Sequence, residues 1–147
     1  MIYAEDITVG ERFAFGRHTV SREEILSFAR EWDPLFLHVD EAAAAAGPFG
    51  GLIASGIHTL GVYMRLAAPA VWLHTAILAG RALREIRFPR PVRPGTTLTG
   101  HLEWREVRPR PSGDAIVVAY AELHEAPAGP EVFSILVEVV MAGRGRA

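Results

Sequence analysis

The stretch that decides the fold is LIASGIHTLGVYMRLAAPA, residues 52–70. Its small and apolar residues recur at the three- and four-residue spacing of one helix face: Ile57, Leu60, Gly61, Met64 and Ala68. The spacing predicts a helix over Ser55–Ala68 that begins at Ser55 or Gly56. Because the neighbouring positions are also apolar, we expect this helix to be mostly buried.

Downstream of this helix the sequence changes to strand patterns separated by Pro- and Gly-containing turns. In TLTGHLEWREV (residues 97–107), alternate positions are polar, and the others share one side: Leu98, Gly100, Leu102 and Trp104. Three further segments have the character of strands: LREIRFPRPV (83–92), AIVVAYAELHEA (115–126) and EVFSILVEVVMAG (131–143). The pattern predicts a long helix followed by three or four strands in antiparallel hairpins, an α+β arrangement.

Upstream, SREEILSFAREW (residues 21–32) indicates a shorter amphipathic helix. Ser21 and Glu24 have the spacing of a capping box, in which each side chain binds the other residue's backbone N–H. The apolar positions fall on one face: Ile25, Phe28 and Ala29. We also expect Asp40 to cap a second short helix, EAAAAA (41–46), which ends in the loop GPFGG.

Between these two helices, Asp33 precedes His38 by five residues. Pro34 disfavours helical geometry at the residue before it, so the first helix should end at Asp33. The carboxylate then lies at the negative end of the helix dipole, which is unfavourable for an anion. Taken singly, Asp33 suits a helix-ending residue and His38 a hydrogen-bonded, partly buried histidine. Together they are a candidate acid–base pair.

Composition restricts the chemistry that the chain can perform. With 147 residues we expect one domain, over residues 1–147. The chain has no Cys and no Lys, which excludes disulfides, thiolate nucleophiles and Schiff bases on a lysine. The formal net charge of −2 argues against nucleic acid as a partner.

The sequence also bears on the compartment. Its first residues lack the basic-then-apolar pattern of a secretory signal. The most apolar stretch, LAAPAVWLHTAILAG, is too short and interrupted to span a bilayer. We therefore expect a cytoplasmic protein without a membrane partner.

The segment FAREWDPLFLHVDEAAAAAGPFGGLIASGIHT (residues 28–59) resembles the signature of the MaoC-like dehydratases, which include the R-specific enoyl-CoA hydratases. That family typically has Asp, any residue, Asn or Gln, Pro, any residue, His, any residue and Asp, before an alanine-rich helix, a Phe and a helix-opening Gly. Five positions match at this spacing: Asp33, His38, Asp40, Phe49 and Gly56. Leu35 stands at the Asn/Gln position and Phe36 at the Pro position, so the chain lacks an amide that steadies the site in the family. YAEDITVGERF (3–13) and IRFPRPVRPGTTLTGHLEW (86–104) extend the resemblance over essentially the whole chain.

The resemblance implies a hot-dog fold, in which an antiparallel sheet wraps a long helix, and a homodimer. It implies a cofactor-independent hydro-lyase of fatty acid metabolism that hydrates a trans-2-enoyl-CoA reversibly to a 3-hydroxyacyl-CoA. Coenzyme A, or an acyl-carrier protein, would be part of the substrate. Asp33 and His38 would share the proton transfers on one water, and the backbone N–H of Gly56 would donate to the thioester oxygen. The start of a helix suits that role because its first N–H groups are unpaired.

Further candidates surround this set. We expect the acyl pocket to be lined by apolar residues: Phe36, Leu37, Phe49, Leu52 and Met64. Ser55 should cap the central helix and is a candidate for substrate contact. Four arginines suit either a solvated strand edge or the phosphates of coenzyme A or a carrier protein: Arg84, Arg87, Arg90 and Arg93. No metal is expected, because Asp33, His38 and His58 match no known ligand spacing.

Other functions remain open at this point. The chain is alternatively a catalytically inactive hot-dog subunit, or an acyl-thioester-binding partner in a heteromeric hydratase, and Leu35 favours that hypothesis. A thioesterase of the same fold usually places its carboxylate on the central helix, and Ser55–Ala68 contains no Asp or Glu. The loop GPFGG lacks the ending of a phosphate-binding P-loop, and no G-x-S-x-G elbow is present.

Overall fold

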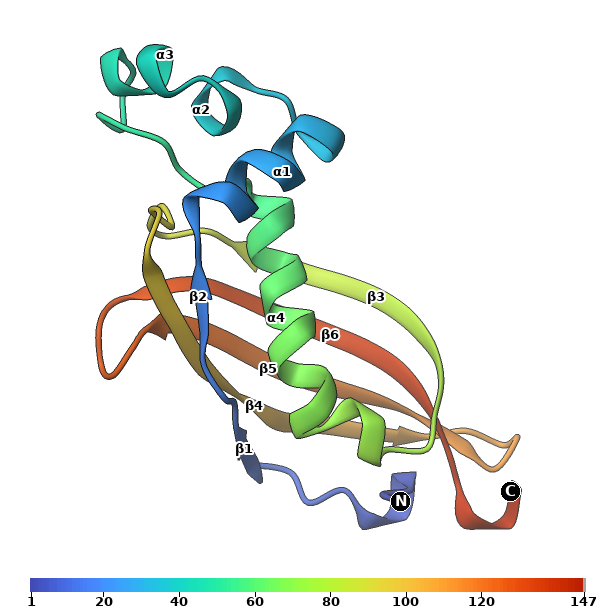
Figure 1. Ribbon diagram of the computed structural model, residues 1–147. Coiled ribbons are helices and arrows are strands. Elements are labelled where there is room, and N and C mark those ends of the chain that lie inside the picture. The colour runs from blue at the N-terminus through green and yellow to red at the C-terminus, as the bar shows by residue number, and fades with distance from the viewer. Residues whose placement is uncertain (147) are drawn as a thin grey trace.

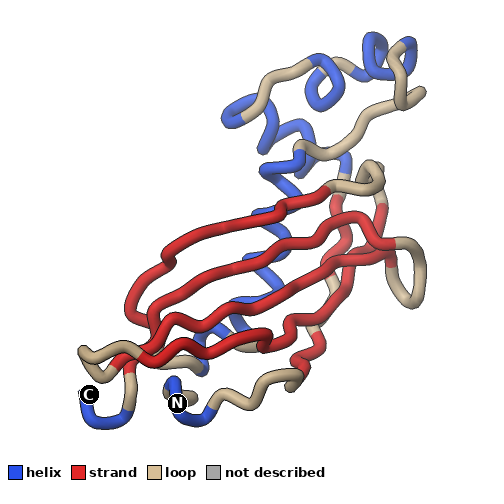
Figure 2. The backbone as a smooth tube through the Cα atoms, turned by 180° about the vertical axis from the view of Figure 1, so that it is seen from behind, coloured by secondary structure: helices blue, strands red, loops and turns tan. Residues whose placement is uncertain are grey.

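The computed structural model describes residues 1–146. Within these residues the chain forms six strands in one antiparallel sheet: β1 (Arg12–Ala14), β2 (His18–Val20), β3 (Ile77–Arg87), β4 (Thr96–Pro109), β5 (Asp114–Glu125) and β6 (Glu131–Ala142). The sheet order is β1-β4-β5-β6-β3, and β2 pairs with the other end of β4. The helix α4 (Gly56–Ala70) lies along one face of the curved sheet, in front of it in Figure 1 and behind it in Figure 2. This is the α+β hot-dog fold.

The strand pattern agrees with the prediction except at β3. Leu98, Gly100, Leu102 and Trp104 all face the core. Gly100 must be glycine, because a Cβ there would lie 1.9 Å from the carbonyl oxygen of Glu122 on the next strand. β4, β5 and β6 form consecutive hairpins as predicted, but β3 pairs with β6 at the far edge. The segment after β3 therefore crosses the end of the sheet. The predicted hairpin between this strand and the next one does not form.

The central helix begins where the sequence predicts but is less buried than expected. Ser55 is its N-cap, and Ser55 Oγ accepts a hydrogen bond of 3.2 Å from the N–H of Ile57. Six of its residues are buried, against the sheet or against α1: His58, Thr59, Val62, Tyr63, Leu66 and Ala67. The predicted stripe lies largely outside, with Ile57 58% and Met64 45% exposed. Because α4 is apolar on most sides, periodicity alone does not identify the face that meets the sheet.

A segment of three helices between β2 and α4 covers the start of α4 beyond the sheet (Figure 1). It consists of α1 (Arg22–Trp32), α2 (Phe36–Val39) and α3 (Glu41–Ala46). Ser21 Oγ accepts from the N–H of Glu24, and Asp40 Oδ1 accepts from that of Ala43, so both predicted caps form. The single turn α2 was not foreseen.

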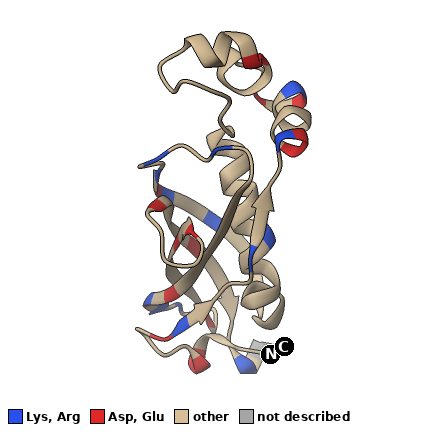
Figure 3. Ribbon diagram, turned by 60° about the vertical axis from the view of Figure 1, so that its left-hand side comes forward, with Lys and Arg blue, Asp and Glu red and all other residues tan. Residues whose placement is uncertain are grey.

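Short 3-10 turns complete the chain: η1 (Ala4–Asp6), η2 (Trp72–His74) and η3 (Arg144–Arg146). The main core lies between α4 and the sheet, where Tyr63 stacks on Phe133 with ring centroids 5.6 Å apart. Arginines and acidic residues are interspersed over the strands rather than gathered in one patch (Figure 3). Ion pairs lie on the sheet's outer side, for example that of Arg12 with Glu103 at 2.5 Å.

Candidate active site

His38 lies on α2 with a defined hydrogen-bond role. Its Nδ1 is 2.8 Å from the carbonyl oxygen of Ile53, and its side chain is 8% exposed. A carbonyl oxygen only accepts, so Nδ1 carries the hydrogen and, in the neutral ring, Nε2 holds a free lone pair. The fold therefore leaves Nε2 available to take a proton.

Asp33 faces this nitrogen from the end of α1. Its Oδ2 lies 3.6 Å from His38 Nε2, slightly beyond hydrogen-bond length. The same oxygen accepts a hydrogen bond of 2.6 Å from Ser55 Oγ. Asp33 is the C-cap of α1, as its position before Pro34 predicts. The sequence-predicted pair is thus brought together, with Ser55 fixing the carboxylate.

Gly56 opens α4 beside this pair. A Cβ at this position would lie 2.9–3.2 Å from three atoms of the Phe88 ring. Any larger residue would therefore have to displace Phe88. Packing against this ring thus requires glycine here, in addition to the predicted role of its N–H. The N–H groups of Ile57 and Thr59 are used within the helix start, by Ser55 Oγ and the Ser55 carbonyl respectively.

A cavity of about 310 Å³ opens next to His38 and Gly56. Much of its lining is apolar: Leu37, Phe49, Ile53, Phe88 and Val92. Its volume is at the lower end of the range for small-molecule sites, roughly 300–1,000 Å³. The N–H of Ala54 donates a hydrogen bond to the carbonyl of Val92. This bond connects the cavity wall at residues 88–92 to the segment that contains Ile53, whose carbonyl binds His38. The cavity suits a small, mostly apolar group close to a titratable pair.

The other predicted lining residues are dispersed. Phe49 lines the cavity, whereas Phe36 is half exposed and lies against Gly47. Leu52 is buried in the main core, and Met64 lies on the exposed stripe of α4. Neither Phe36, Leu52 nor Met64 is among the residues that line the cavity.

Sequence reasoning missed two parts of this site. Ile53 contributes through its carbonyl, which every residue possesses, so no side-chain pattern could reveal it. The wall at residues 88–92 could have been suspected from FPRPV, because its prolines interrupt the strand pattern and indicate a rigid connection.

The four arginines near β3 do not act as one group. Arg84 and two other arginines pair with Glu138 on the outer side of the sheet, and Arg87 lies 3.9 Å from Glu85. Arg90 lines the cavity, and Arg93 donates a hydrogen bond of 2.7 Å to the carbonyl of Phe49. Only the last two are therefore placed close to the candidate site.

A second titratable cluster lies on a different face of α4. Glu24 Oε1 is 2.9 Å from His18 Nε2 and 3.0 Å from His58 Nε2. Burial by itself raises the pKa of Glu24, but the hydrogen bonds from His58 and His18 outweigh it and hold that pKa below its usual value. The predicted capping box is therefore only half formed, because the carboxylate that should close it binds the two histidines.

Two negative findings concern residues 1–146. No helix among them is both long and apolar enough to cross a bilayer. No group of three or more His, Asp or Glu side chains among them is arranged to hold a metal ion.

The sequence pattern of the family described as MaoC like domain matches residues 6–125. The chain therefore belongs to the MaoC-like dehydratase family, a family of hydro-lyases. The crystal structure of the MaoC-like dehydratase from Rhodospirillum rubrum superposes with a TM-score of 0.88 at 36% identity, covering 98% of this chain and 99% of that one.

Two curated relatives support the same assignment. The uncharacterized protein YdeM of Bacillus subtilis is 35% identical over 106 residues, 72% of this chain and 75% of that protein. The 3-hydroxyacyl-thioester dehydratase Z of Mycobacterium tuberculosis is 40% identical over 80 residues, 53% of each chain. None of these relatives fixes the substrate of this chain.

Proposed function

We propose that this protein hydrates a trans-2-enoyl thioester reversibly to a 3-hydroxyacyl thioester, with Asp33 and His38 as the acid–base pair. The observation that supports this most is the 3.6 Å approach of His38 Nε2 to Asp33 Oδ2 beside a cavity and a helix start. Membership of the dehydratase family agrees with it, as does similarity over half its length to a 3-hydroxyacyl-thioester dehydratase. Coenzyme A or an acyl-carrier protein enters as part of the substrate, and no cofactor takes part.

The reaction needs a proton taken from water and a proton given to carbon. In hydration, the water oxygen bonds to C3 while one of its protons passes to the base, and C2 receives a proton from the acid. The lone pair on His38 Nε2 suits the first transfer. Asp33, fixed by Ser55, orients the water, and His38 then passes to C2 the proton that it took from the water, so that the two parts of one water molecule are added across the double bond. In dehydration the same groups act in reverse.

Negative charge develops on the thioester oxygen during this step. We assign its stabilisation to the backbone N–H of Gly56, which lines the cavity at the positive end of α4. A donor fixed in this way lowers the barrier by roughly 3–4 kcal/mol. The substrate-contacting residues in this proposal are Phe49 and the apolar cavity wall, with Ser55 acting through Asp33.

The test is hydration of crotonyl-CoA and of a longer enoyl-CoA, followed as loss of the enoyl-thioester absorbance. Asp33→Asn and His38→Ala should each reduce turnover by more than about a hundredfold, since acid–base groups contribute roughly 10²–10⁴-fold. Glu23→Gln, an exposed carboxylate of α1 that lines neither the cavity beside His38 nor the hollow between α1 and α4, is the matched control. Turnover that survives in both site variants would refute the assignment.

We further propose that a second copy of the chain covers β3 and the outer stripe of α4. β3 is an edge strand with large exposed apolar side chains: Ile77, Leu78, Leu83 and Ile86. Ile57 and Met64 add exposed apolar surface on α4. Unpaired edges and patches of this kind favour association. Light scattering should give twice the mass of one chain, and a monomer at micromolar concentration would contradict this.

An inactive subunit of a heteromeric hydratase is the second candidate. The exposed side chains of Leu35 and Phe36, 57% and 47% exposed, favour it because they present apolar surface beside the site. A folded wild-type protein without turnover on any thioester, which gains activity only with another MaoC-like chain, would establish this alternative.

A further inference from the structure

The last part of β3 contains a β-bulge. Arg84 opposes Leu136 on β6. Arg87 opposes Ser134, so three steps along β3 correspond to two steps along β6. Within the bulge, Glu85 has a φ of +50° and is the one non-glycine residue among residues 1–146 with a positive φ. Glycine is the usual residue at a left-handed bulge position, because a Cβ there crowds the backbone. The chain thus keeps this bulge with a residue that strains it.

The bulge changes the face on which the following side chains lie. Side chains alternate between the faces of a sheet, and directly opposed residues share a face. Arg84 binds Glu138 on the outer face, so regular alternation would place Phe88 on that face too. Ser134, four residues before Glu138 along β6, also faces outward, and Arg87 opposes it. Phe88, the next residue, therefore faces inward.

Phe88 consequently packs on the start of α4. An added Cβ at Gly56 would lie 2.9–3.2 Å from three atoms of the Phe88 ring. The ring also lies against Phe133 of the core, with centroids 5.8 Å apart and planes at 46°. β3 thus ends beside the first turn of the central helix (Figure 1). Phe88 lines the cavity of His38 and is 48% exposed, so part of its ring is open to a bound molecule.

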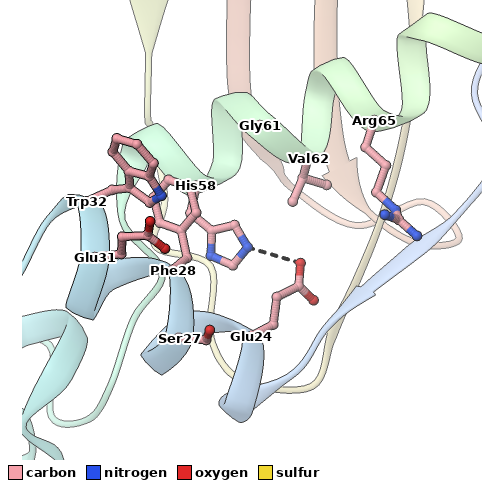
Figure 4. A pocket seen from close by; sticks show the side chains of 9 residues that line it. All are labelled: Glu24, Ser27, Phe28, Glu31, Trp32, His58, Gly61, Val62 and Arg65. Carbon is pink, nitrogen blue, oxygen red and sulfur yellow. Dashed lines mark hydrogen bonds and ion pairs between the residues drawn. The ribbon is translucent and has the colours of Figure 1, made fainter.

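The first turn of α4 is held from another side by α1. His58 Nε2 lies 3.0 Å from Glu24 Oε1, and its ring stacks on Phe28 with centroids 4.7 Å apart, at the hollow between α1 and α4 (Figure 4). His58 follows Gly56 by two residues, which is a rotation of about 200° around a helix. Contacts to α1 and to Phe88 therefore lie on different faces of the same turn. Between them they fix the position of Gly56.

This packing concerns the group to which we assign the charge of the thioester oxygen. The N–H of Gly56 stabilises that charge only if the carbonyl oxygen approaches it at hydrogen-bond distance. A conjugated enoyl thioester is flat, so a flat ring beside Gly56 restricts how it lies in the cavity. A misplacement of about 1 Å costs roughly a hundredfold in rate. The orientation of Phe88 therefore bears directly on the reaction.

We propose that the bulge at Glu85 is a positioning element of the site: it turns Phe88 onto Gly56, and Phe88 orients the enoyl thioester toward the N–H of Gly56. Glu85 is then a positioning residue that acts through its backbone conformation. Its carboxylate is 62% exposed and lies 3.9 Å from Arg87, away from the cavity. The role in orienting the substrate rests on the proposed hydratase function, whereas the placement of Phe88 is testable without turnover.

The first experiment replaces Glu85 by residues that differ in their tolerance of a positive φ. Valine is β-branched and hardly adopts this conformation, so Glu85→Val should remove the bulge. We expect kcat for crotonyl-CoA to fall by about tenfold or more with a smaller change in KM, because orientation rather than affinity is lost. Glu85→Gly adopts a positive φ freely and should restore kcat. Glu106→Val, the same exchange on β4 at a residue without a positive φ, is the matched control.

The dependence on Phe88 separates positioning from a general loss of stability. In the Phe88→Ala background, Glu85→Val should lower kcat by less than about twofold, because the ring that the bulge orients is already absent. A further tenfold fall in that background would overturn the proposal. So would a wild-type kcat in Glu85→Val itself.

The second experiment needs no substrate. In wild type, Gly56→Ala places its Cβ against Phe88 and should lower the urea midpoint of unfolding. In Glu85→Val the same change should lower the midpoint by less than about half as much, because the ring has moved away. Glu85→Ala, which disfavours a positive φ less than valine does, gives the same comparison if Glu85→Val does not fold.

The two experiments fail in different ways. Equal shifts of the urea midpoint with and without the bulge would show that the bulge does not place Phe88. Absence of turnover on every thioester by folded wild type would instead refute the proposed hydratase function, and the urea comparison would still decide the placement of Phe88.

Discussion

Ser55 Oγ donates a hydrogen bond of 2.6 Å to Asp33 Oδ2 while accepting one of 3.2 Å from the N–H of Ile57. One fully buried hydroxyl thereby connects the C-cap of α1 to the first turn of α4. The candidate carboxylate is held by the same group that caps the central helix. Local stability and site geometry are consequently coupled at Ser55.

Ser55→Ala should therefore reduce both stability and turnover. Loss of a cap costs about 1 kcal/mol of unfolding free energy, and loss of a hydrogen bond to a charged group about 1.5–3 kcal/mol. We expect kcat for an enoyl-CoA to fall by about tenfold or more with a smaller change in KM, because Asp33 loses its orientation. Ser21→Ala is the matched control, since it removes the cap of α1 without touching Asp33. Equal effects of both variants on kcat would contradict a positioning role for Ser55.

Gly56→Ala should destabilise the protein through Phe88. The new Cβ would lie 2.9 Å from Cζ of that ring, although alanine is otherwise the better helix residue. We expect a loss of about 1–3 kcal/mol, as in other overpacked sites. In the double variant Gly56→Ala/Phe88→Ala, the cost of the first change should largely vanish, and a double-mutant cycle in urea measures this coupling. Additive losses would mean that the ring moves aside freely.

Acid should weaken the contact between α1 and α4 through Glu24. Its pKa lies below the ordinary value of 4.5, so ionised Glu24 stabilises the fold fully above about pH 4.5. That contribution is lost as the pH falls through the lowered pKa, because protonation removes the negative charge that the hydrogen bonds from His58 and His18 stabilise. The difference in unfolding free energy between wild type and Glu24→Gln should shrink between pH 6 and pH 3.

Denaturant titrations at several pH values check this dependence. Glu23→Gln removes an exposed neighbouring acid and should give a small difference that hardly varies with pH. If the difference in unfolding free energy between wild type and Glu24→Gln grows toward low pH, the prediction is wrong.

The sequence predicts those features that depend on local spacing. Asp33 ends a helix because of Pro34, Ser55 caps another, and the fixed gap to His38 brings the pair together. Glu24 shows the limit of such reasoning, because its capping-box spacing is correct but its carboxylate binds histidines on β2 and α4. Partners that the fold brings together from distant parts of the chain leave no local signal.

The same limit explains the errors at α4 and β3. A helix that is apolar on most sides offers several faces, so its buried face depends on the sheet it meets. The strand that pairs with β3 depends on how the chain crosses the sheet, and this connection is set by packing rather than by turn residues.

The outer side of the sheet provides the last prediction. Glu138 is 7% exposed and binds three guanidinium groups, with Arg108 Nη2 at 2.8 Å, Arg81 Nε at 3.4 Å and Arg84 Nη2. Glu138→Gln leaves these three charges facing one another without their common anion. Because the arginines are about half exposed, solvent screens part of the cost. We expect a loss of about 2 kcal/mol of unfolding free energy, below the roughly 3–5 kcal/mol of a fully buried pair.

Urea unfolding of Glu138→Gln measures that loss, and Glu106→Gln is its control. Glu106 lies on the neighbouring surface, 52% exposed, and has one arginine contact of 3.4 Å. Its removal should change the unfolding free energy by less than about 0.5 kcal/mol. Added salt should narrow the difference between wild type and Glu138→Gln only slightly, because the carboxylate is shielded from solvent. Similar losses of unfolding free energy in Glu138→Gln and Glu106→Gln would show that burial does not increase the stabilising effect of Glu138.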